Sequence, residues 1–439
     1  MSFPVYPAYK SLGFEWLGEV PEHWGRSCIK YIAEINMGQS PSSDDCNVDG
    51  FGLPFLQGNS EFGSEYPTPK QYCPVARKFA DAGDLLISVR APVGALNEAD
   101  QVYGIGRGLC ALKPSGRVTK NFLRWFLSSS QSFLDSISTG STFEAISAEQ
   151  VANIPIALPR HVSEQAQIAR FLDHETACID ALIEEQQRLI ELLKEKRQTV
   201  ISHAVTKGLD PTVLMKDSGV EWLGEVPVHW EVLATKRFFR MVVDPAPENN
   251  DFELLSIYTE IGVRPRKDLE QKGNKASTTD GYLRVKKGDL IVNKLLAWMG
   301  AIGHSEYDGV TSPAYDILRP GRELAPKFYH YVFRGKSAQQ EFKRWSRGIM
   351  EMRLRLYFDE LGRILMPFPP SGEQEKIVEF IEAMEAKFDS LTQAASEQVK
   401  LLSERRSALI SAAVTGKIDV RSWQPPASAQ APELEKEAV

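Results

Sequence analysis

Two long stretches of the chain place apolar residues three or four positions apart, which is the pattern of an amphipathic helix that packs against another helix. The first stretch covers residues 161–210 and the second covers residues 371–420, and Gly208 and Gly416 lie where such helices end. At 1.5 Å per residue each helix would be roughly 65 Å long. We therefore expect each apolar stripe to pack against the other long helix, with an ordinary long core helix as the alternative. The residues assigned to heptad positions a and d of this spacer are Leu172, Ile179, Leu182, Leu189, Leu193, Ile381, Met384, Phe388, Leu391 and Leu402.

The stretches outside these helices predict a mixed α and β structure. Short apolar or β-branched runs such as 84–89 and 289–292 alternate with turns rich in glycine and proline, as strands do. Amphipathic helical patterns follow near 119–137 and 326–346.

The two halves of the sequence repeat one another. The segment Glu15–Pro21 (E-W-L-G-E-V-P) recurs at Glu221–Pro227, and His23–Trp24 recurs at His229–Trp230. Further matches follow in the same order and at nearly constant spacing: Gly83–Ile87 with Gly288–Val292, Glu164–Gln165 with Glu373–Gln374, Phe171 with Phe380, Ala204–Thr206 with Ala413–Thr415, and Leu209–Asp210 with Ile418–Asp419. The chain is therefore two copies of one unit of about 200 residues.

The repeat and the helical stretches together predict an order of domains. We expect a globular domain over 1–160 that includes the segment 14–24, a long helix over 161–210, a second globular domain over 211–370 that includes the segment 220–230, a second long helix over 371–420, and a disordered tail over 421–439.

Charge is distributed unevenly along the chain. The whole chain has 51 Lys and Arg against 58 Asp and Glu, a net charge of −7, which excludes a uniformly basic coat for nucleic acid. Residues 231–358, however, contain 22 Lys and Arg against 16 Asp and Glu. A basic face for a polyanion is compatible with this distribution, and a merely solvated basic face is the alternative.

Several chemistries lack their signature in the sequence. The five cysteines are scattered without a C-x-x-C pair, which predicts a reducing cytoplasm and argues against disulfides and zinc. The sequence has no run of 18 apolar residues and no visible signal peptide, so we expect no membrane segment. The histidines show no metal-binding spacing, and no pair of carboxylates is singled out for acid–base work. A binding protein is therefore expected, and an enzyme with an unrecognised nuclease centre is the alternative.

A specific combination of motifs resembles the specificity (S) subunit of type I restriction–modification systems. The motifs are E-W-L-G-E-V-P-x-H-W at 15–24 and 221–230, G-x-S-P at Gly38–Pro41, Arg107–Gly108 before a strand, Gly140–Thr142, Asn293–Leu295, Ala297–Gly300 and Ser312–Asp316. The resemblance covers residues 10 to 420.

The resemblance implies a mixed α/β (α+β) fold with an internal pseudo-twofold repeat, in which two target-recognition domains are separated by two long helices in an antiparallel coiled coil. Such subunits have no catalytic activity. Each domain reads one half of a bipartite, asymmetric sequence in double-stranded DNA, and the helices fix the gap. The implied partners are two methyltransferase (M) subunits, which use S-adenosylmethionine, and two restriction/motor (R) subunits, which use ATP and Mg²⁺. This chain itself would bind no cofactor or metal.

Comparison of the two copies suggests which residues read DNA. Positions that differ between the copies are free to read different bases, through side chains that donate or accept hydrogen bonds at base edges, while surrounding Lys and Arg contact phosphates. For each residue, a plain surface or structural role is the alternative, and for the whole chain the alternative is a tandem-repeat scaffold that binds proteins without touching DNA. The candidates are Gln39, Ser40, Gln57, Asn59, Arg90, Ser141 and Thr142 in the first copy and Arg264, Arg266, Lys267, Lys294, Arg347, Arg353 and Arg355 in the second.

Overall fold

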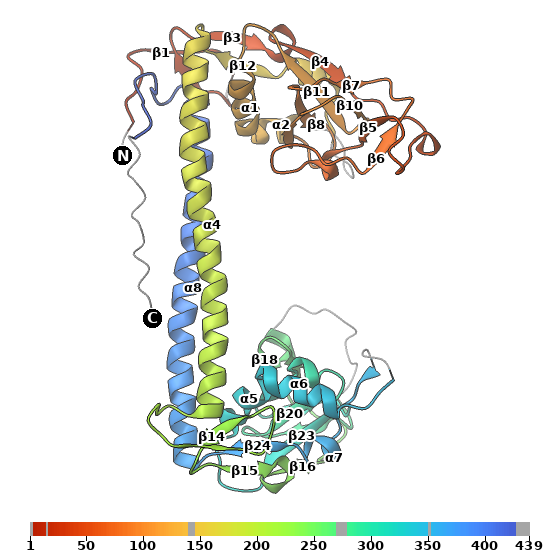
Figure 1. The fold of residues 1–439 in the computed structure, drawn as a ribbon, viewed down its shortest axis with the longest axis vertical. Coiled ribbons are helices and arrows are strands. Elements are labelled where there is room, and N and C mark those ends of the chain that lie inside the picture. The colour runs from red at the N-terminus through yellow and green to blue at the C-terminus, as the bar shows by residue number, and fades with distance from the viewer. Residues whose placement is uncertain (1–2, 15, 139–144, 269–278, 350–352, 427–439) are drawn as a thin grey trace. The chain divides into compact units, whose positions relative to one another are not determined.

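The computed structural model describes residues 3–14, 16–138, 145–268, 279–349 and 353–426. The chain forms two compact units. Unit 1 comprises Met1–Gln186 with Glu397–Val439, and unit 2 comprises Gln187–Ser396. Each long helix therefore contributes residues to both units (Figure 1).

The first copy of the repeat contains, in chain order, β1 (Tyr9–Ser11), β2 (Glu19–Pro21), β3 (Gly25–Cys28), β4 (Ala33–Met37), β5 (Leu53–Leu56), β6 (Gln71–Cys73), β7 (Phe79–Ala80), β8 (Leu85–Ser88), β9 (Leu96–Glu98), β10 (Tyr103–Ile105), β11 (Leu109–Pro114), α1 (Lys120–Ser129), α2 (Gln131–Ile137), α3 (Ala148–Ala152), β12 (Pro155–Leu158) and α4 (Val162–Lys207).

The second copy contains β13 (Met215–Asp217), β14 (Glu225–Pro227), β15 (Glu231–Ala234), β16 (Phe239–Val242), β17 (Leu255–Tyr258), β18 (Gly262–Pro265), β19 (Leu283–Val285), β20 (Leu290–Asn293), β21 (Ile302–His304), β22 (Gly309–Thr311), β23 (Tyr315–Pro320), α5 (Pro326–Arg334), α6 (Lys336–Trp345), α7 (Phe358–Leu361), β24 (Leu365–Phe368) and α8 (Ser371–Val414).

The two copies share one frame. Unit 1 has an antiparallel sheet in the order β4-β11-β8-β9, and unit 2 has the matching order β16-β23-β20-β21. The pairs β1-β2 and β12-β3 likewise correspond to β13-β14 and β15-β24. The predicted mixed α/β fold with an internal repeat is therefore confirmed.

The copies differ in the strands added to this frame. Unit 1 has a second sheet in the order β6-β5-β10-β7, whose β5 and β10 run parallel. Unit 2 instead has two small antiparallel pairs, β17-β18 and β19-β22. Five of the candidate DNA-binding residues lie in or next to these differing strands: Gln57, Asn59, Arg264, Arg266 and Lys267.

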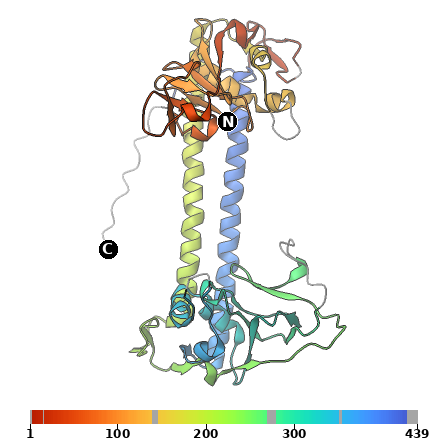
Figure 2. The ribbon, with the colours of Figure 1, turned by 90° about the vertical axis from the view of Figure 1, so that its right-hand side faces the viewer.

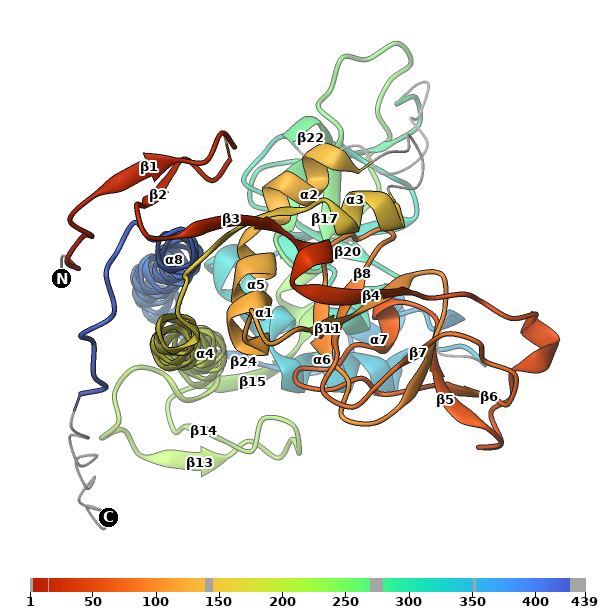
Figure 3. The same cartoon turned by 90° about the horizontal axis from the view of Figure 1, so that it is seen from above.

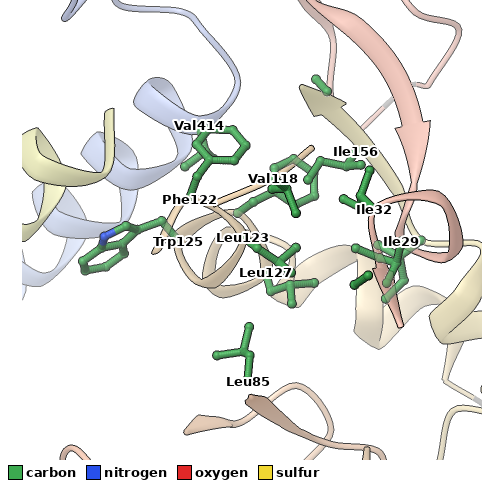
Figure 4. Close-up of a cluster of buried hydrophobic side chains, with 14 of the residues drawn as sticks. Ile29, Ile32, Leu85, Val118, Phe122, Leu123, Trp125, Leu127, Ile156 and Val414 are labelled. Carbon is green, nitrogen blue, oxygen red and sulfur yellow. The ribbon is translucent and has the colours of Figure 1, made fainter. Parts of the chain in front are cut away.

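The core of unit 1 forms where the frame meets the long helices. Thr119 caps α1 by accepting a hydrogen bond from the Phe122 amide at 3.4 Å, and α1 buries Phe122, Leu123 and Phe126. These side chains pack in one cluster with Leu85 of the sheet and with Val414 from the end of α8 (Figure 4). The end of the second long helix is therefore part of the core of the first copy.

Within each unit, the parts of α4 and α8 that belong to it lie alongside each other (Figure 2). In unit 1, Gln167 donates to the Val420 carbonyl at 3.1 Å, and Arg406 Nε lies 2.7 Å from Asp180 Oδ1. In unit 2, Arg197 NH1 lies 2.9 Å from Asp389 Oδ1. In unit 1, the partner of Gln167 is residue 420 and the partner of Asp180 is residue 406, so the two helices run antiparallel there.

The predicted seam of this helix pair was wrong at three positions. Leu182, Leu189 and Leu391 are 46%, 41% and 54% exposed. On α4, the buried or half-buried line passes instead through Ile179 and Ile183, four residues apart. The other assigned residues are buried (Leu172, Ile179, Ile381, Phe388) or half-buried (Leu193, Met384, Leu402).

The two ends of the chain lie together in unit 1. Asp419 donates its amide hydrogen to the Pro4 carbonyl at 2.8 Å. Figure 3 looks along the long helices and shows β1 and β2 beside the end of α8, where a Cβ added to Gly416 would lie only 2.3 Å from Pro21. Of the predicted disordered tail, Arg421 pairs with Asp419 at 2.6 Å, and residues 427–439 lie outside the described residues.

No helix in the described ranges is long and apolar enough to cross a membrane.

Candidate nucleic-acid interface

In unit 1, the candidate Gln57 and a further polar side chain, Arg107, are brought to one sheet edge by a pair of parallel strands. Gln57 directly follows β5, and Arg107 lies two residues after β10. Because parallel strands end at the same edge of a sheet, these residues meet although they are fifty positions apart. The Gly106 amide donates to the Leu56 carbonyl at 2.7 Å and fixes the two strand ends together.

Ser40 joins this edge through its hydroxyl. Gln57 Nε2 donates to Ser40 Oγ at 2.9 Å, and the Arg107 amide donates to the same oxygen at 3.1 Å. The backbone at residue 38 can approach the backbone at residue 106 this closely only as glycine, because a Cβ added to Gly38 would lie 2.1 Å from the Gly106 carbonyl oxygen. The G-x-S-P motif therefore serves close backbone packing, and Ser40 positions Gln57.

Arg90 and Asn59 lie beside the same edge. The Val89 amide donates to the Gly108 carbonyl at 2.9 Å, which places Arg90 next to the turn that holds Arg107. Asn59 follows Gln57 by two residues and begins a short 3₁₀ turn. We call Gln39, Gln57, Asn59, Arg90 and Arg107 cluster 1.

Four side chains of cluster 1 are available to a ligand. Within the described residues, Gln39, Asn59, Arg90 and Arg107 have no hydrogen-bonded or ion-paired side-chain partner, and Gln39, Arg90 and Arg107 are exposed. Amides and guanidinium groups of this kind suit base edges and phosphates. The sequence pattern does not single out Arg107 as a DNA-binding candidate, although its Gly-x-Gly-Arg-Gly turn is visible in the sequence.

In unit 2, four basic candidates gather at the corresponding place. Lys294 follows β20, and its carbonyl accepts a hydrogen bond from the Leu356 amide at 2.9 Å. Arg347 and Arg355 face each other in an antiparallel bridge with two backbone hydrogen bonds of 2.9 Å. We call Lys294, Arg347, Arg353 and Arg355 cluster 2.

The members of cluster 2 differ in their availability. Lys294 Nζ lies 3.2 Å from Asp316 Oδ1, and Arg347 forms an ion pair with Glu360. Arg353 and Arg355 are exposed and, among the described residues, have no side-chain partner. Arg353 and Arg355 are therefore the strongest candidates of unit 2 for contact with DNA.

The remaining candidates of unit 2 lie on β18 and the turn after it. Arg264 NH1 donates to the Tyr307 hydroxyl at 3.1 Å, Lys267 forms an ion pair with Glu253, and Arg266 is half-buried. Ser141 and Thr142 lie outside the described residues.

Arg264 also lines a hollow of about 770 Å³ in unit 2. Carboxylates balance the cations of its walls, as where Lys327 Nζ lies 2.6 Å from Glu382 Oε1. Burial lowers the pKa of His330, which lines the same hollow, to about 3, so this ring is neutral at pH 7. The hollow therefore has no excess positive charge for a phosphate. The described residues also contain no group of three or more His, Cys, Asp or Glu that could hold a metal ion.

The repeated tryptophan segment has a structural role in unit 1. The Glu164 carboxylate, at the start of α4, accepts hydrogen bonds from the Tyr6 hydroxyl at 2.9 Å and from Trp24 Nε1 at 3.0 Å, and His23 Nε2 lies 2.9 Å away. Burial, and then the charge of Glu164, raises the pKa of Tyr6.

The same contact recurs in unit 2. The Glu373 carboxylate at the start of α8 accepts from Trp230 Nε1 at 3.1 Å, and His229 Nε2 lies 2.7 Å away. The matched segments therefore fasten each globular part to the start of a long helix.

Comparison with known proteins agrees with this arrangement. Residues 21–193 match the family model of the type I restriction modification DNA specificity domain. A protein of Methanocaldococcus jannaschii, assigned as the MjaX specificity subunit of a type I restriction enzyme, is 37% identical over 202 residues, which are 45% of this chain and 46% of that protein. The EcoDI specificity subunit of Escherichia coli is 22% identical over 369 residues and 78% of each chain.

A solved structure shares the fold. The crystal structure of the HsdS subunit from Thermoanaerobacter tengcongensis matches with a TM-score of 0.54 at 15% identity, over 91% of this chain and 98% of that one. Residues 21–193 are therefore similar to a type I restriction modification DNA specificity domain, and the chain shares the fold of the HsdS subunit. The match to the M. jannaschii relative spans less than half of that protein's length.

Proposed function

We propose that this chain is the DNA-recognition subunit of a type I restriction–modification complex, and that each unit reads one half of a bipartite, asymmetric target. The observation that carries the proposal is one frame, present twice, with different polar side chains beside its matching strands: Arg90 of cluster 1 follows β8, and Lys294 of cluster 2 follows β20. Cluster 1 offers amides and two arginines, whereas cluster 2 is made of Lys and Arg alone. Amide and guanidinium groups pair with different bases, so two unlike half-sites follow.

The long helices would set the gap between the half-sites. Both α4 and α8 contribute to both units and pack antiparallel within unit 1. A helix pair of this kind resists bending, so the number of residues in the helices would set the distance between the two surfaces that read DNA.

The segments that match between the copies would serve partners that dock twice. Two methyltransferase subunits with S-adenosylmethionine, and two motor-nuclease subunits with ATP and Mg²⁺, would supply the chemistry, and this chain would catalyse no step and bind none of these cofactors. The complex would act on DNA in the cytoplasm.

Exchange of one globular part tests whether each unit reads one half of the target. Residues 25–160 begin at β3 and end after β12, which pair with each other, so a relative's segment can replace them with the ladder intact. In a host that also expresses the methyltransferase subunit, methylome sequencing should show a change in one half of the modified sequence only. A change in both halves would contradict the proposal. Replacement of the globular part of the second copy is the matched control.

Cluster 2 predicts a loss of affinity on removal of one arginine. The Arg355→Ala chain, in complex with its methyltransferase partner, should bind its target about 1–3 kcal/mol more weakly, because a free guanidinium leaves the interface. Arg322 is the control, because it is exposed and follows the last residue of β23, whereas cluster 2 lies beside the first residue of that strand. Arg322→Ala should change the free energy of binding by less than about 0.5 kcal/mol.

Fluorescence anisotropy with the duplex at about 50 to 200 mM salt measures both affinities and their salt dependence. Wild-type affinity should fall steeply as salt rises, because counterions are released from phosphates. The net charge of −7 favours the alternative of a scaffold that binds only proteins. A flat salt response, or equal effects of the two variants, would support that alternative.

A further inference from the structure

Phe171 of α4 and Phe380 of α8 occupy matching positions of the repeat, but only one of them is covered. In unit 1 the Phe171 ring is fully buried. The rings of Phe3 and Trp423 each lie edge-on to it, with centroids 5.3 Å away. These two aromatic residues come from the N-terminal and C-terminal segments of the chain.

In unit 2, Phe380 is 38% exposed and borders a hollow of about 320 Å³. Val200, Ala204 and Leu209 form the apolar walls of this hollow. Ala204 and Leu209 match Ala413 and Ile418 in the other copy, so the hollow is built at the same positions of the repeat as the surface beside Phe171. We call it the Phe380 hollow.

Chain connectivity explains why the Phe380 hollow is uncovered. Unit 1 has two free segments beside its helices, held together by the hydrogen bond from Asp419 to Pro4. In unit 2 one continuous stretch runs from Gly208 to β13, and the positions that correspond to Phe3 and Trp423 are Leu209 and Leu214. Leu209 is part of the hollow's wall and Leu214 is 76% exposed. Among the described residues, no aromatic ring packs against Phe380 as those of Phe3 and Trp423 pack against Phe171.

The basic residues that line the Phe380 hollow favour a ligand that carries a carboxylate. Its lining residues include Lys196 and His203 and no carboxylate. Leu192 lies one turn before Lys196 on the same face of α4 and is 52% exposed, so the apolar surface continues beyond the hollow. A helix face with exposed apolar residues around a pocket is typical of a protein-binding site.

We propose that the Phe380 hollow is a docking site for a protein partner that inserts an aromatic side chain and carries a carboxylate close to it in sequence. The other copy shows the ring geometry that fits, an aromatic ring edge-on to the matching phenylalanine, and Lys196 and His203 of the lining suit the carboxylate. The two halves of the chain are therefore unequal as docking surfaces, because unit 1 covers this position with its own residues.

A peptide taken from this chain is the probe. It comprises residues 416–426, with fluorescein at its N-terminus, and its binding to the full-length chain is followed by fluorescence anisotropy. We expect saturable binding at one site per chain, at least tenfold weaker for the Phe380→Ala chain and unchanged for Leu391→Ala, which removes another exposed apolar side chain of α8. A peptide with alanine in place of Trp423 should not bind.

A second variant separates loss of the site from loss of structure. Thr199 is an exposed residue of the lining, and Thr199→Trp fills the hollow while Phe380 stays in place. It should abolish peptide binding, with circular dichroism unchanged. Absence of saturable binding, or equal affinity for the wild-type and Phe380→Ala chains, would overturn the proposal; the second result would mean that the peptide exchanges with the chain's own segment in unit 1.

Sedimentation of the chain alone identifies the occupant. We expect a monomer at every concentration, since the partner is a different protein. Self-association that is lost in both Trp423→Ala and Phe380→Ala would show that the occupant is the C-terminal segment of a second copy, and would overturn the assignment to a separate partner.

Discussion

Replacement of Glu164 by alanine should lower the free energy of unfolding of unit 1 by about 3 kcal/mol. Its carboxylate is almost fully buried and accepts hydrogen bonds from Tyr6 and Trp24, whose side chains are also buried. The substitution leaves two buried donors without an acceptor, and each such donor costs roughly 1–3 kcal/mol. His23 is partly exposed, so loss of its contact adds little.

Denaturant unfolding of the full chain, followed by tryptophan fluorescence, measures this loss. Glu184→Ala is the matched control, because Glu184 is an exposed residue of the same helix, and its effect should stay below about 0.5 kcal/mol. Glu373→Ala should give an intermediate loss, since Glu373 accepts from Trp230 and, among the residues that the structure describes, has no hydrogen bond that corresponds to the one from Tyr6. Equal losses for Glu164→Ala and Glu184→Ala would show that the buried contacts do not stabilise the unit.

The helices and the repeat could be predicted because their signals are local. The stretches 161–210 and 371–420 contain α4 and α8, which end one residue before Gly208 and two residues before Gly416. The matched glycine-led segments that start at Gly83 and Gly288 lead into the matching strands β8 and β20. In both cases a short segment carries the information that fixes its own conformation.

The seam between the helices could not be predicted in the same way. On α4, apolar residues follow Ile179 at both three and four residues, as Leu182 and Ile183. Which of the two faces the partner depends on the angle and register of the other helix, which no local pattern contains. The heptad pattern predicts Leu182 at the seam, whereas Ile183 is the half-buried residue.

The candidate site was predictable only in part, for a related reason. Gln57 and Arg107 meet because β5 and β10 pair in parallel, and nothing near either residue in the sequence indicates that pairing. Ion pairs also depend on tertiary structure: Lys294 and Lys267 suit phosphates by residue type, but Asp316 and Glu253 already occupy them. Residue type therefore selected plausible side chains, and only the fold shows which are free.

Insertion of one heptad into both long helices should move recognition to a target whose gap is about three base pairs longer. Seven residues add about 10 Å to a helix, and a base pair of DNA spans about 3.4 Å. The insertions go after Arg188 in α4 and after Glu397 in α8, close to the points where each helix passes from one unit to the other. A heptad in each helix keeps the buried faces of both helices in register.

Selection of bound duplexes from a library with variable gaps, followed by sequencing, measures the change. Three base pairs also turn the second half-site by about 100° around the duplex, so we expect weaker binding to the new target together with complete loss of the original one. Insertion into α4 alone is the control, because it leaves α8 too short to pair along its length and should abolish binding at every gap. If the doubly extended chain still selected the original gap, the helices would not be what spaces the half-sites, and the spacing would have to come from the globular parts themselves.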